Sequence, residues 1–222
     1  MFVGECDVCQ SGVQIGDQVV YKLCFSTRAD PQAKEVDICR RAAIPFTVHH
    51  RRRPHLQVYS DSFANGITVF SELICTQNDM GLYNLLQNEC ARIARPRLGN
   101  THRGVRNPNV PGVGLICSRI QDMFGITAAN VVVSCYADAS STRPWHQDKF
   151  RSNEELAIIC SFGGERQLLF KHLCTGSVVP IKQLNGTVTI FGRTLNSECV
   201  HGIMSEHGAA PRLSVTIWGK RR

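Results

Sequence analysis

The stretch of sequence that decides the fold spans residues 131–149 and reads VVVSCYADASSTRPWHQDK. It begins with β-branched residues, which favour a β-strand. Turn-forming residues follow, and His146 and Asp148 come directly after them. In an extended chain residues i and i+2 point to the same side, so these two side chains can bind one metal ion. The stretch therefore predicts a strand followed by part of a metal site.

The same β character continues towards the end of the chain. Short β-branched or alternating runs are separated by turn residues that include Gly163-Gly164 and Asn185-Gly186. This spacing predicts a sandwich or barrel of antiparallel strands. The expected strands are 131–136, 156–161, 167–171, 188–191 and 213–218.

Residues 80–95 precede this β region and carry apolar side chains at helical spacing. Leu82, Leu86 and Ile93 fall on one face, which predicts an amphipathic helix that ends before a proline. Residues 96–114 bring prolines, glycines and arginines together, which predicts a loop or lid and no packed element.

A third metal ligand is available near the end of the β region, at His201. An H-x-D pair alone is common in solvated loops. Two histidines and one carboxylate on one face of an iron ion leave three adjacent positions open, which is the arrangement of non-haem Fe(II) oxygenases. The three residues together therefore favour an oxygen-using iron site.

Several further motifs accompany these residues in a fixed order. That order resembles the AlkB family of Fe(II)/2-oxoglutarate-dependent dioxygenases over roughly residues 130–218, with weaker agreement over 56–100. The motifs are Tyr136-Ala137-Asp138, His146-Gln147-Asp148-Lys149, Ser161-Phe162-Gly163-Gly164-Glu165-Arg166, Gly186-Thr187-Val188-Thr189-Ile190, His201-Gly202-Ile203 and Pro211-Arg212-Leu213-Ser214-Val215-Thr216.

The resemblance implies a mainly β fold with flanking helices (α+β), a double-stranded β-helix or jelly roll. It also implies that His146, Asp148 and His201 bind Fe(II), with the His201 context preferred over the alternative ligand His207. Tyr136 and Arg212 match the residues that bind the cosubstrate 2-oxoglutarate, which reacts with O2. An arginine fork suits this role because it meets a carboxylate in two parallel hydrogen bonds.

Two positions depart from the family pattern. The family usually has a second arginine six residues after the first, and here that residue is Trp218. Either a basic residue of the C-terminal tail replaces it or one cosubstrate contact is lost. An acid that contacts the base in bacterial members is replaced by Phe150, which either stacks on a base or packs in the interior.

The charge of the chain points to a polyanionic partner. The net charge is +7, and two stretches, between Asp37 and Asp61 and between Glu89 and Asp122, contain arginines and no acids. Neutralising phosphates releases counterions, so such stretches are consistent with binding to DNA or RNA. They are equally consistent with a plain basic surface. Candidate substrate contacts are Phe150, Trp145, which otherwise forms wall or core, and His102 and Arg103 in the expected lid.

The first 55 residues have a separate character. Cys6 and Cys9 form a C-x2-C pair, and Cys24 and Cys39 follow at regular spacing, so these four thiols either bind a structural zinc ion or are ordinary cysteines. His49, His50 and His55 are possible substitutes for one of these ligands. We therefore expect a cysteine-rich module over 1–55 and an AlkB-like dioxygenase domain over 56–222.

The leading hypothesis is oxidative demethylation of N-alkylated bases in DNA or RNA, as in DNA repair. The alternatives are a catalytically impaired nucleic-acid-binding module and a protein hydroxylase on the same fold. The 222-residue sequence has no apolar run of the roughly 20 residues that a membrane helix requires. We expect an intracellular protein of the nucleus or cytoplasm that does not enter membranes, and we favour a monomer.

Overall fold

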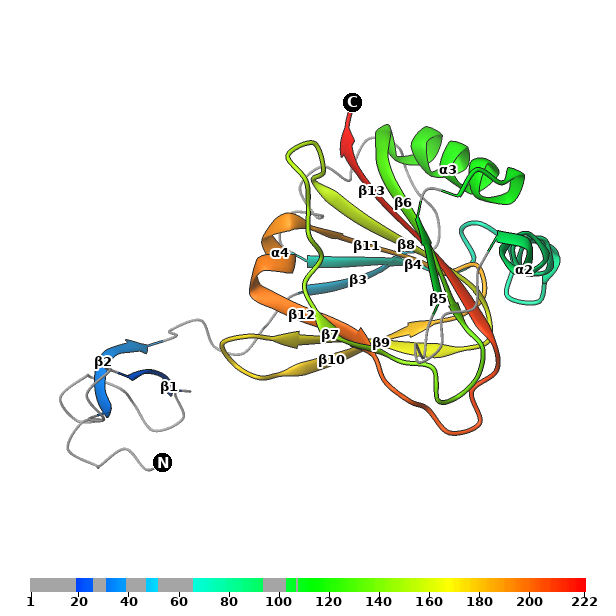
Figure 1. The fold of residues 1–222 in the computed structure, drawn as a ribbon. Coiled ribbons are helices and arrows are strands. Elements are labelled where there is room, and N and C mark those ends of the chain that lie inside the picture. The colour runs from blue at the N-terminus through cyan, green and yellow to red at the C-terminus, as the bar shows by residue number, and fades with distance from the viewer. Residues whose placement is uncertain (1–18, 26–30, 39–46, 52–65, 94–102, 107) are drawn as a thin grey trace. The chain divides into compact units, whose positions relative to one another are not determined.

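The computed structural model describes residues 19–25, 31–38, 47–51, 66–93, 103–106 and 108–222 (Figure 1). Its elements are β1 (Val19–Phe25), β2 (Pro31–Ile38), β3 (Thr47–Arg51), β4 (Gly66–Phe70), α2 (Gly81–Ile93), β5 (Arg103–Arg106), α3 (Pro111–Phe124), β6 (Ile126–Tyr136), β7 (Arg143–His146), β8 (Leu156–Gly163), β9 (Arg166–His172), β10 (Val178–Gln183), β11 (Val188–Gly192), α4 (Arg193–Glu198), β12 (Cys199–Ile203) and β13 (Arg212–Arg221). No helix within these ranges is both long and apolar enough to span a membrane.

The first part of the chain contributes one antiparallel pair, β1 with β2. The predicted zinc ligands belong to this part. Cys6, Cys9 and Cys39 lie outside the described residues, and Cys24 lies on β1 without a described side chain. The expected boundary at residue 55 is also outside the described ranges, so the separate module stays a prediction.

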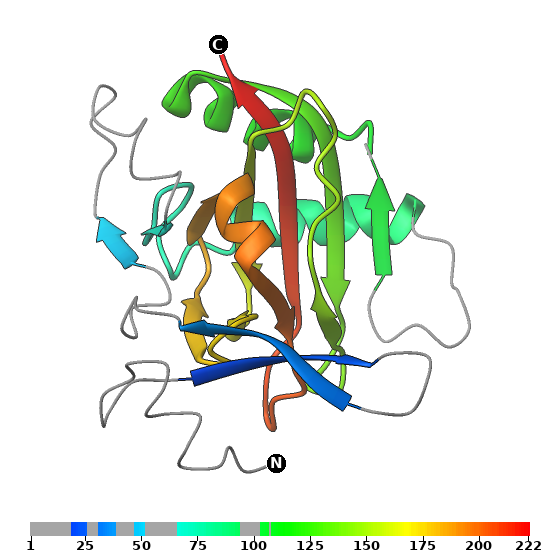
Figure 2. The same ribbon diagram turned by 90° about the vertical axis from the view of Figure 1, so that its left-hand side faces the viewer.

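The second part is built from two β-sheets. A seven-stranded sheet has the order β3-β4-β11-β8-β13-β6-β5, and a four-stranded sheet has the order β10-β9-β12-β7. All neighbouring strands in these two sheets are antiparallel except β3 and β4. Helices α2 and α3 lie along the outer face of the large sheet, as Figures 1 and 2 show. This is the predicted jelly roll with flanking helices.

The two faces of β13 contact different parts of the interior. One face packs against helices α2 and α3, and the other faces the space between the two sheets. Successive side chains of a strand point to opposite faces. Leu213, Val215 and Ile217 therefore pack in one cluster with residues of α2 and α3 such as Leu86 and Ile120. The alternate residues face the small sheet, and they are Arg212, Ser214, Thr216 and Trp218.

Helix α2 confirms the helix predicted from the spacing of apolar residues. Leu86 is fully buried, but Leu82 is only partly buried and Leu85 is 40% exposed. The buried stripe includes Glu89, whose two carboxylate oxygens accept hydrogen bonds from the backbone N–H of Gly112 at 3.0 and 3.1 Å. An acid on α2 thus binds the beginning of α3.

The prediction that residues 96–114 contain no packed element is wrong. Strand β5 pairs with β6, and α3 begins at Pro111. Proline is common at the first helical position, where its missing N–H costs no hydrogen bond. A β-carbon at Gly112 would lie 2.7 Å from Glu89 Oε2, so close packing requires this glycine. Residues that resemble a loop in sequence therefore form a strand and a helix start.

The turn at Asn185-Gly186 is fixed by tertiary contacts as well as by its backbone. Asn185 Nδ2 donates to the carbonyl oxygen of Asp79 at 2.7 Å. Gly186 has φ +78°, and a β-carbon there would lie 2.0 Å from the carbonyl oxygen of Cys75. Only glycine fits this position without strain.

We expect Gly186→Ala to lower the free energy of unfolding by about 1–3 kcal/mol, the cost of one strained backbone position, with a further loss from the clash. The matched control is Gly208→Ala. Gly208 has φ +74°, but a β-carbon there would have no heavy atom within 4 Å, so only the backbone cost applies. Urea unfolding measures both variants, and equal losses would contradict the steric argument.

Candidate metal centre

Two strands of the small sheet bring the two histidines together. His146 ends β7 and His201 lies in β12, and the two residues are direct cross-strand partners. Their ring centroids are 4.4 Å apart. Directly opposed residues on one face of an antiparallel pair are neighbours, so the register alone places both imidazoles on one side.

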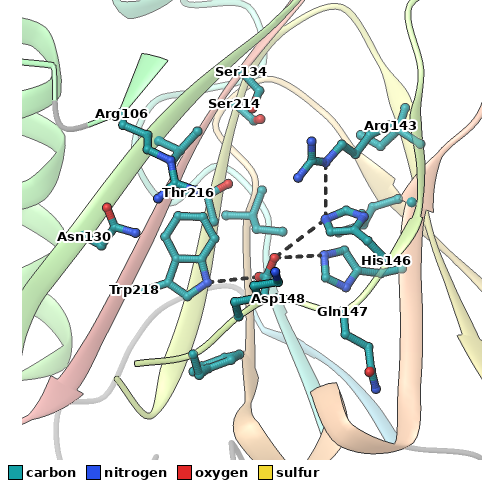
Figure 3. A pocket seen from close by; sticks show the side chains of 18 of the residues that line it. Arg106, Asn130, Ser134, Arg143, His146, Gln147, Asp148, Ser214, Thr216 and Trp218 are labelled. Carbon is teal, nitrogen blue, oxygen red and sulfur yellow. Dashed lines mark hydrogen bonds and ion pairs between the residues drawn. The ribbon is translucent and has the colours of Figure 1, made fainter. Parts of the chain in front are cut away.

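Asp148 completes the group from the segment that follows β7. Its Oδ1 lies 3.7 Å from His146 Nε2 and 3.8 Å from His201 Nε2 (Figure 3). The three ligand atoms lie within 4.8 Å of one another, so they can share one metal ion. The donor set is two imidazole nitrogens and one carboxylate oxygen, which suits non-haem Fe(II).

Hydrogen bonding directs His146 Nε2 towards the centre. The Nδ1 of His146 lies 2.8 Å from the carbonyl oxygen of Pro144 and donates to it, which leaves the lone pair on Nε2. Arg143 Nε donates to that lone pair at 3.3 Å. A bound metal ion would replace this arginine contact.

His201 is held in its neutral form. It is 4% exposed, and burial lowers its pKa to about 3, with His146 and Arg143 adding to the effect. Its Nδ1 is buried without a hydrogen-bond partner among the described residues. A neutral imidazole is the form that binds metals. His201 is therefore a ligand that acid does not readily protonate.

The backbone of Asp148 is anchored by helix α4. Its N–H donates to Asn196 Oδ1 at 2.9 Å, and Asn196 Nδ2 donates to its carbonyl oxygen at 2.9 Å. Gln147 Nε2 donates to the carbonyl oxygen of Asn196 at 2.7 Å. Burial raises the pKa of Asp148, and the nearby His146 opposes that rise. No local sequence signal identifies Asn196, because its role depends on the packing of α4 against the 147–148 segment.

The carboxylate of Asp148 has one further partner. Trp218 Nε1 donates to Oδ2 at 3.0 Å, and Oδ1 is the oxygen nearest the histidines. The sequence identifies Trp218 only as a departure from the family pattern. Its contact with Asp148 escapes sequence analysis because it depends on the position of β13 beside the 147–150 segment.

His146, Asp148, His201 and Trp218 line a cavity of about 720 Å³ between the two sheets. Arg212, 1% exposed, lies in its wall, and its guanidinium carbon is 5.1 Å from the ring centroid of Tyr136. Arg212 Nε donates to Ser161 Oγ at 2.9 Å. Its Nη1 and Nη2 are buried without hydrogen-bond partners among the described residues.

Burial lowers the pKa of Arg212, and the neighbouring Tyr136 opposes the shift. A buried guanidinium with two unsatisfied nitrogens is costly unless an anion pairs with it. The wall of the cavity is therefore suited to a carboxylate.

Exposed cations also line the cavity. They are Arg106, Arg143, Lys149 and Arg151, whereas Asp148 is the single acid among the described lining residues. The surroundings of the metal group therefore favour an anionic ligand.

The remaining predicted contacts divide into three groups. Phe150 lines the cavity and also packs against a second cluster of buried residues, which includes Phe170 and Phe191. The Arg193 guanidinium lies 5.4 Å from its ring centroid. Trp145 is 38% exposed and does not line the cavity. His207 is exposed and lies outside the metal group. His102 lies outside the described residues, and Arg103 begins β5 without a described side chain.

Comparison with known proteins supports the fold. No family model matches the sequence, and no curated protein matches it. A structure of OsALKBH1 matches with 13% identity and a TM-score of 0.51, covering 69% of this chain and 97% of that chain. A prolyl-4-hydroxylase of Pseudomonas putida matches with 16% identity and a TM-score of 0.49, covering 71% of this chain and 93% of that chain. The similarity to OsALKBH1 shows a shared fold, and at 13% identity it shows the fold alone.

Proposed function

We propose that this protein is an Fe(II)- and 2-oxoglutarate-dependent dioxygenase that oxidatively demethylates N-alkylated bases in DNA or RNA. The main support for the proposal is that a metal-ligand set and a buried arginine line the same cavity. His146, Asp148 and His201 can form a metal-ligand set. The same cavity is lined by the buried Arg212, whose Nη1 and Nη2 have no hydrogen-bond partner among the described residues.

Each residue has a defined task in this proposal. His146, Asp148 and His201 would hold the iron. Arg212 would bind the distal carboxylate of 2-oxoglutarate, and Tyr136 would form a hydrogen bond with this cosubstrate. With O2, iron and 2-oxoglutarate supply an oxidant strong enough to hydroxylate an N-methyl group, which then leaves as formaldehyde, while 2-oxoglutarate becomes succinate and CO2.

The protein itself contributes position and electrostatics. The Pro144 carbonyl fixes the tautomer of His146, and burial keeps His201 neutral. Arg212 is held by Ser161 before any ligand arrives, so its orientation costs little entropy on binding. The site is thus preorganised for a dianionic cosubstrate.

The choice of nucleic acid rests on the cations that line the cavity. A phosphodiester backbone offers regularly spaced negative charges, and basic side chains gain affinity from it by releasing counterions. Arg106 lies on the edge strand β5, and Lys149 and Arg151 follow the ligand Asp148. These cations would hold the strand while the target base is flipped towards the iron.

The deciding experiment measures formaldehyde and succinate release from methylated single- and double-stranded DNA and RNA oligomers with Fe(II) and 2-oxoglutarate. Formaldehyde that depends on the methylated oligomer supports the proposal. Oligomer binding without succinate release would instead identify a silent binding module. Succinate release that methylated oligomers fail to stimulate would indicate another substrate, such as a protein.

We expect Lys149→Gln and Arg151→Gln to weaken oligomer binding to a similar degree for all sequences. Each lost phosphate contact should reduce the slope of log affinity against log salt by about 0.7–0.9. Lys182→Gln is the control, because Lys182 is an exposed cation outside the cavity that pairs with Glu165 at 3.0 Å. Salt titrations of fluorescent oligomers measure the slopes, and a slope unchanged in both cavity variants would contradict the proposed path.

A further inference from the structure

We infer that Trp218 is a positioning residue of the candidate metal centre. Its indole N–H holds Oδ2 of Asp148, so that the carboxylate presents a single oxygen, Oδ1, to the two histidines. The inference deepens the proposed function and rests on it for the identity of the ion. The hydrogen bond between Trp218 and Asp148 does not depend on which ion is bound.

The sheet determines where the indole lies. Trp218 pairs with Asn130 on β6 and with Ala157 on β8, so β13 is held on both sides at this residue. Strand alternation then turns the ring into the cavity, where Figure 3 shows its nitrogen directed at Asp148. The Nε1–Oδ2 distance of 3.0 Å is that of a normal hydrogen bond.

The two ends of Asp148 are therefore held by different elements. Asn196 of α4 binds its backbone on both sides, and Trp218 of β13 binds its outer carboxylate oxygen. The side chain of Asp148 is 8% exposed, so water has little access to compete for the indole donor. Outer hydrogen-bond partners of this kind orient metal ligands and tune their affinity.

Tryptophan differs in charge and in number of donors from the arginine that the family pattern has at this position, where it contacts the cosubstrate. Arginine is a cation with five donors, whereas indole is a neutral ring with one donor. A guanidinium close to a divalent ion would repel it, and the repulsion is strong in a poorly solvated site. Trp218 orients Asp148 and adds no charge. Trp218 therefore adds no second cation to that of Arg143, whose Nε lies 3.3 Å from His146 Nε2.

The first test examines the contact without any metal. The chain contains two tryptophans, so its 15N-correlated proton spectrum shows two indole N–H signals, which Trp145→Phe assigns. We expect Asp148→Ala to move the Trp218 signal upfield and speed its exchange with water, and to leave the Trp145 signal in place. An unmoved Trp218 signal in a folded Asp148→Ala protein would overturn the inference.

The second test measures Co2+ affinity by titration calorimetry together with the visible spectrum of the bound Co2+. We expect Trp218→Phe to weaken binding by about 10–100-fold, the range for lost outer-shell partners, and to alter the Co2+ absorption bands. Trp145→Phe is the matched control, since it is the same substitution outside the cavity, and its affinity should equal that of the wild type.

The outcomes separate this inference from the proposed function. Equal Co2+ affinity and identical spectra for Trp218→Phe and the wild type would overturn the role of Trp218 and leave the oxygenase proposal intact. Failure of the folded wild type to bind Co2+ would overturn the metal centre itself. The indole signal would still decide whether Trp218 contacts Asp148.

Discussion

Asp148→Ala should lower succinate release by at least about 10³-fold, because loss of a direct ligand costs more than the 10–100-fold of an outer partner. The substitution leaves two imidazoles to hold the ion and removes the only carboxylate of the group. Succinate quantified after a fixed reaction time, with saturating Fe(II) and 2-oxoglutarate, measures the effect.

The protein should remain folded in this variant. Burial already disfavours the charged carboxylate, as the raised pKa of Asp148 indicates, so its removal relieves a desolvation cost. Asp122→Ala is the control, because it removes an exposed carboxylate from α3 on the outer face of the large sheet. Turnover by Asp148→Ala above a tenth of the wild-type rate would remove Asp148 from the metal centre.

Arg212→Met should raise the half-saturating concentration of 2-oxoglutarate by about 10²-fold or more. Hydrogen bonds to charged groups contribute about 1.5–3 kcal/mol each, and the two free nitrogens of Arg212 can form two of them. Arg212→Lys should lose most of the same affinity, since an ammonium group cannot form the fork and does not replace the bond to Ser161. Calorimetric titration of the anaerobic metal-loaded protein measures both.

Arg212→Met should not lower the thermal stability of the protein in the absence of 2-oxoglutarate. Replacing a buried, unpaired cation by an apolar side chain of similar length is neutral or stabilising. Arg212→Met should therefore melt at or above the wild-type temperature without 2-oxoglutarate. Addition of 2-oxoglutarate should raise the melting temperature of the wild type but not that of Arg212→Met. Arg221→Met removes an exposed cation and serves as control. An unchanged half-saturating concentration would place the cosubstrate carboxylate elsewhere.

Part of the fold follows from local sequence patterns. The strands after residue 130 are dense in β-branched residues, and the helix over 80–95 has clear periodicity, so β6, β8, β9, β11, β13 and α2 all appear in the expected places. Strand β5 and helix α3 are not among the predicted elements, because the glycines and prolines of 96–114 resemble a loop. The short strands β7, β10 and β12 are not predicted either. Tertiary contacts, such as that between Glu89 and Gly112, override that composition.

The candidate site can be predicted only in part from the sequence. The H-x-D spacing places His146 and Asp148 on one side, whereas His201 joins them through the pairing of β12 with β7. The contacts of Asn196 and Trp218 with Asp148 join residues 48 and 70 positions apart. Such contacts depend on the packing of whole elements, which a single sequence does not encode in any local pattern. The zinc module of the first 55 residues stays a prediction.

The position of β7 at the border of the small sheet has a consequence for handling the protein. This four-residue strand carries His146, and its one partner in the sheet is β12, which carries His201. A shared ion would fasten the two strands together. Chelators would remove the ion and weaken the pairing of the two strands. If β7 detached, the backbone of β12 could pair with a strand from another molecule. We therefore expect the protein to aggregate faster when it is stored without metal, which can be observed before any assay of turnover.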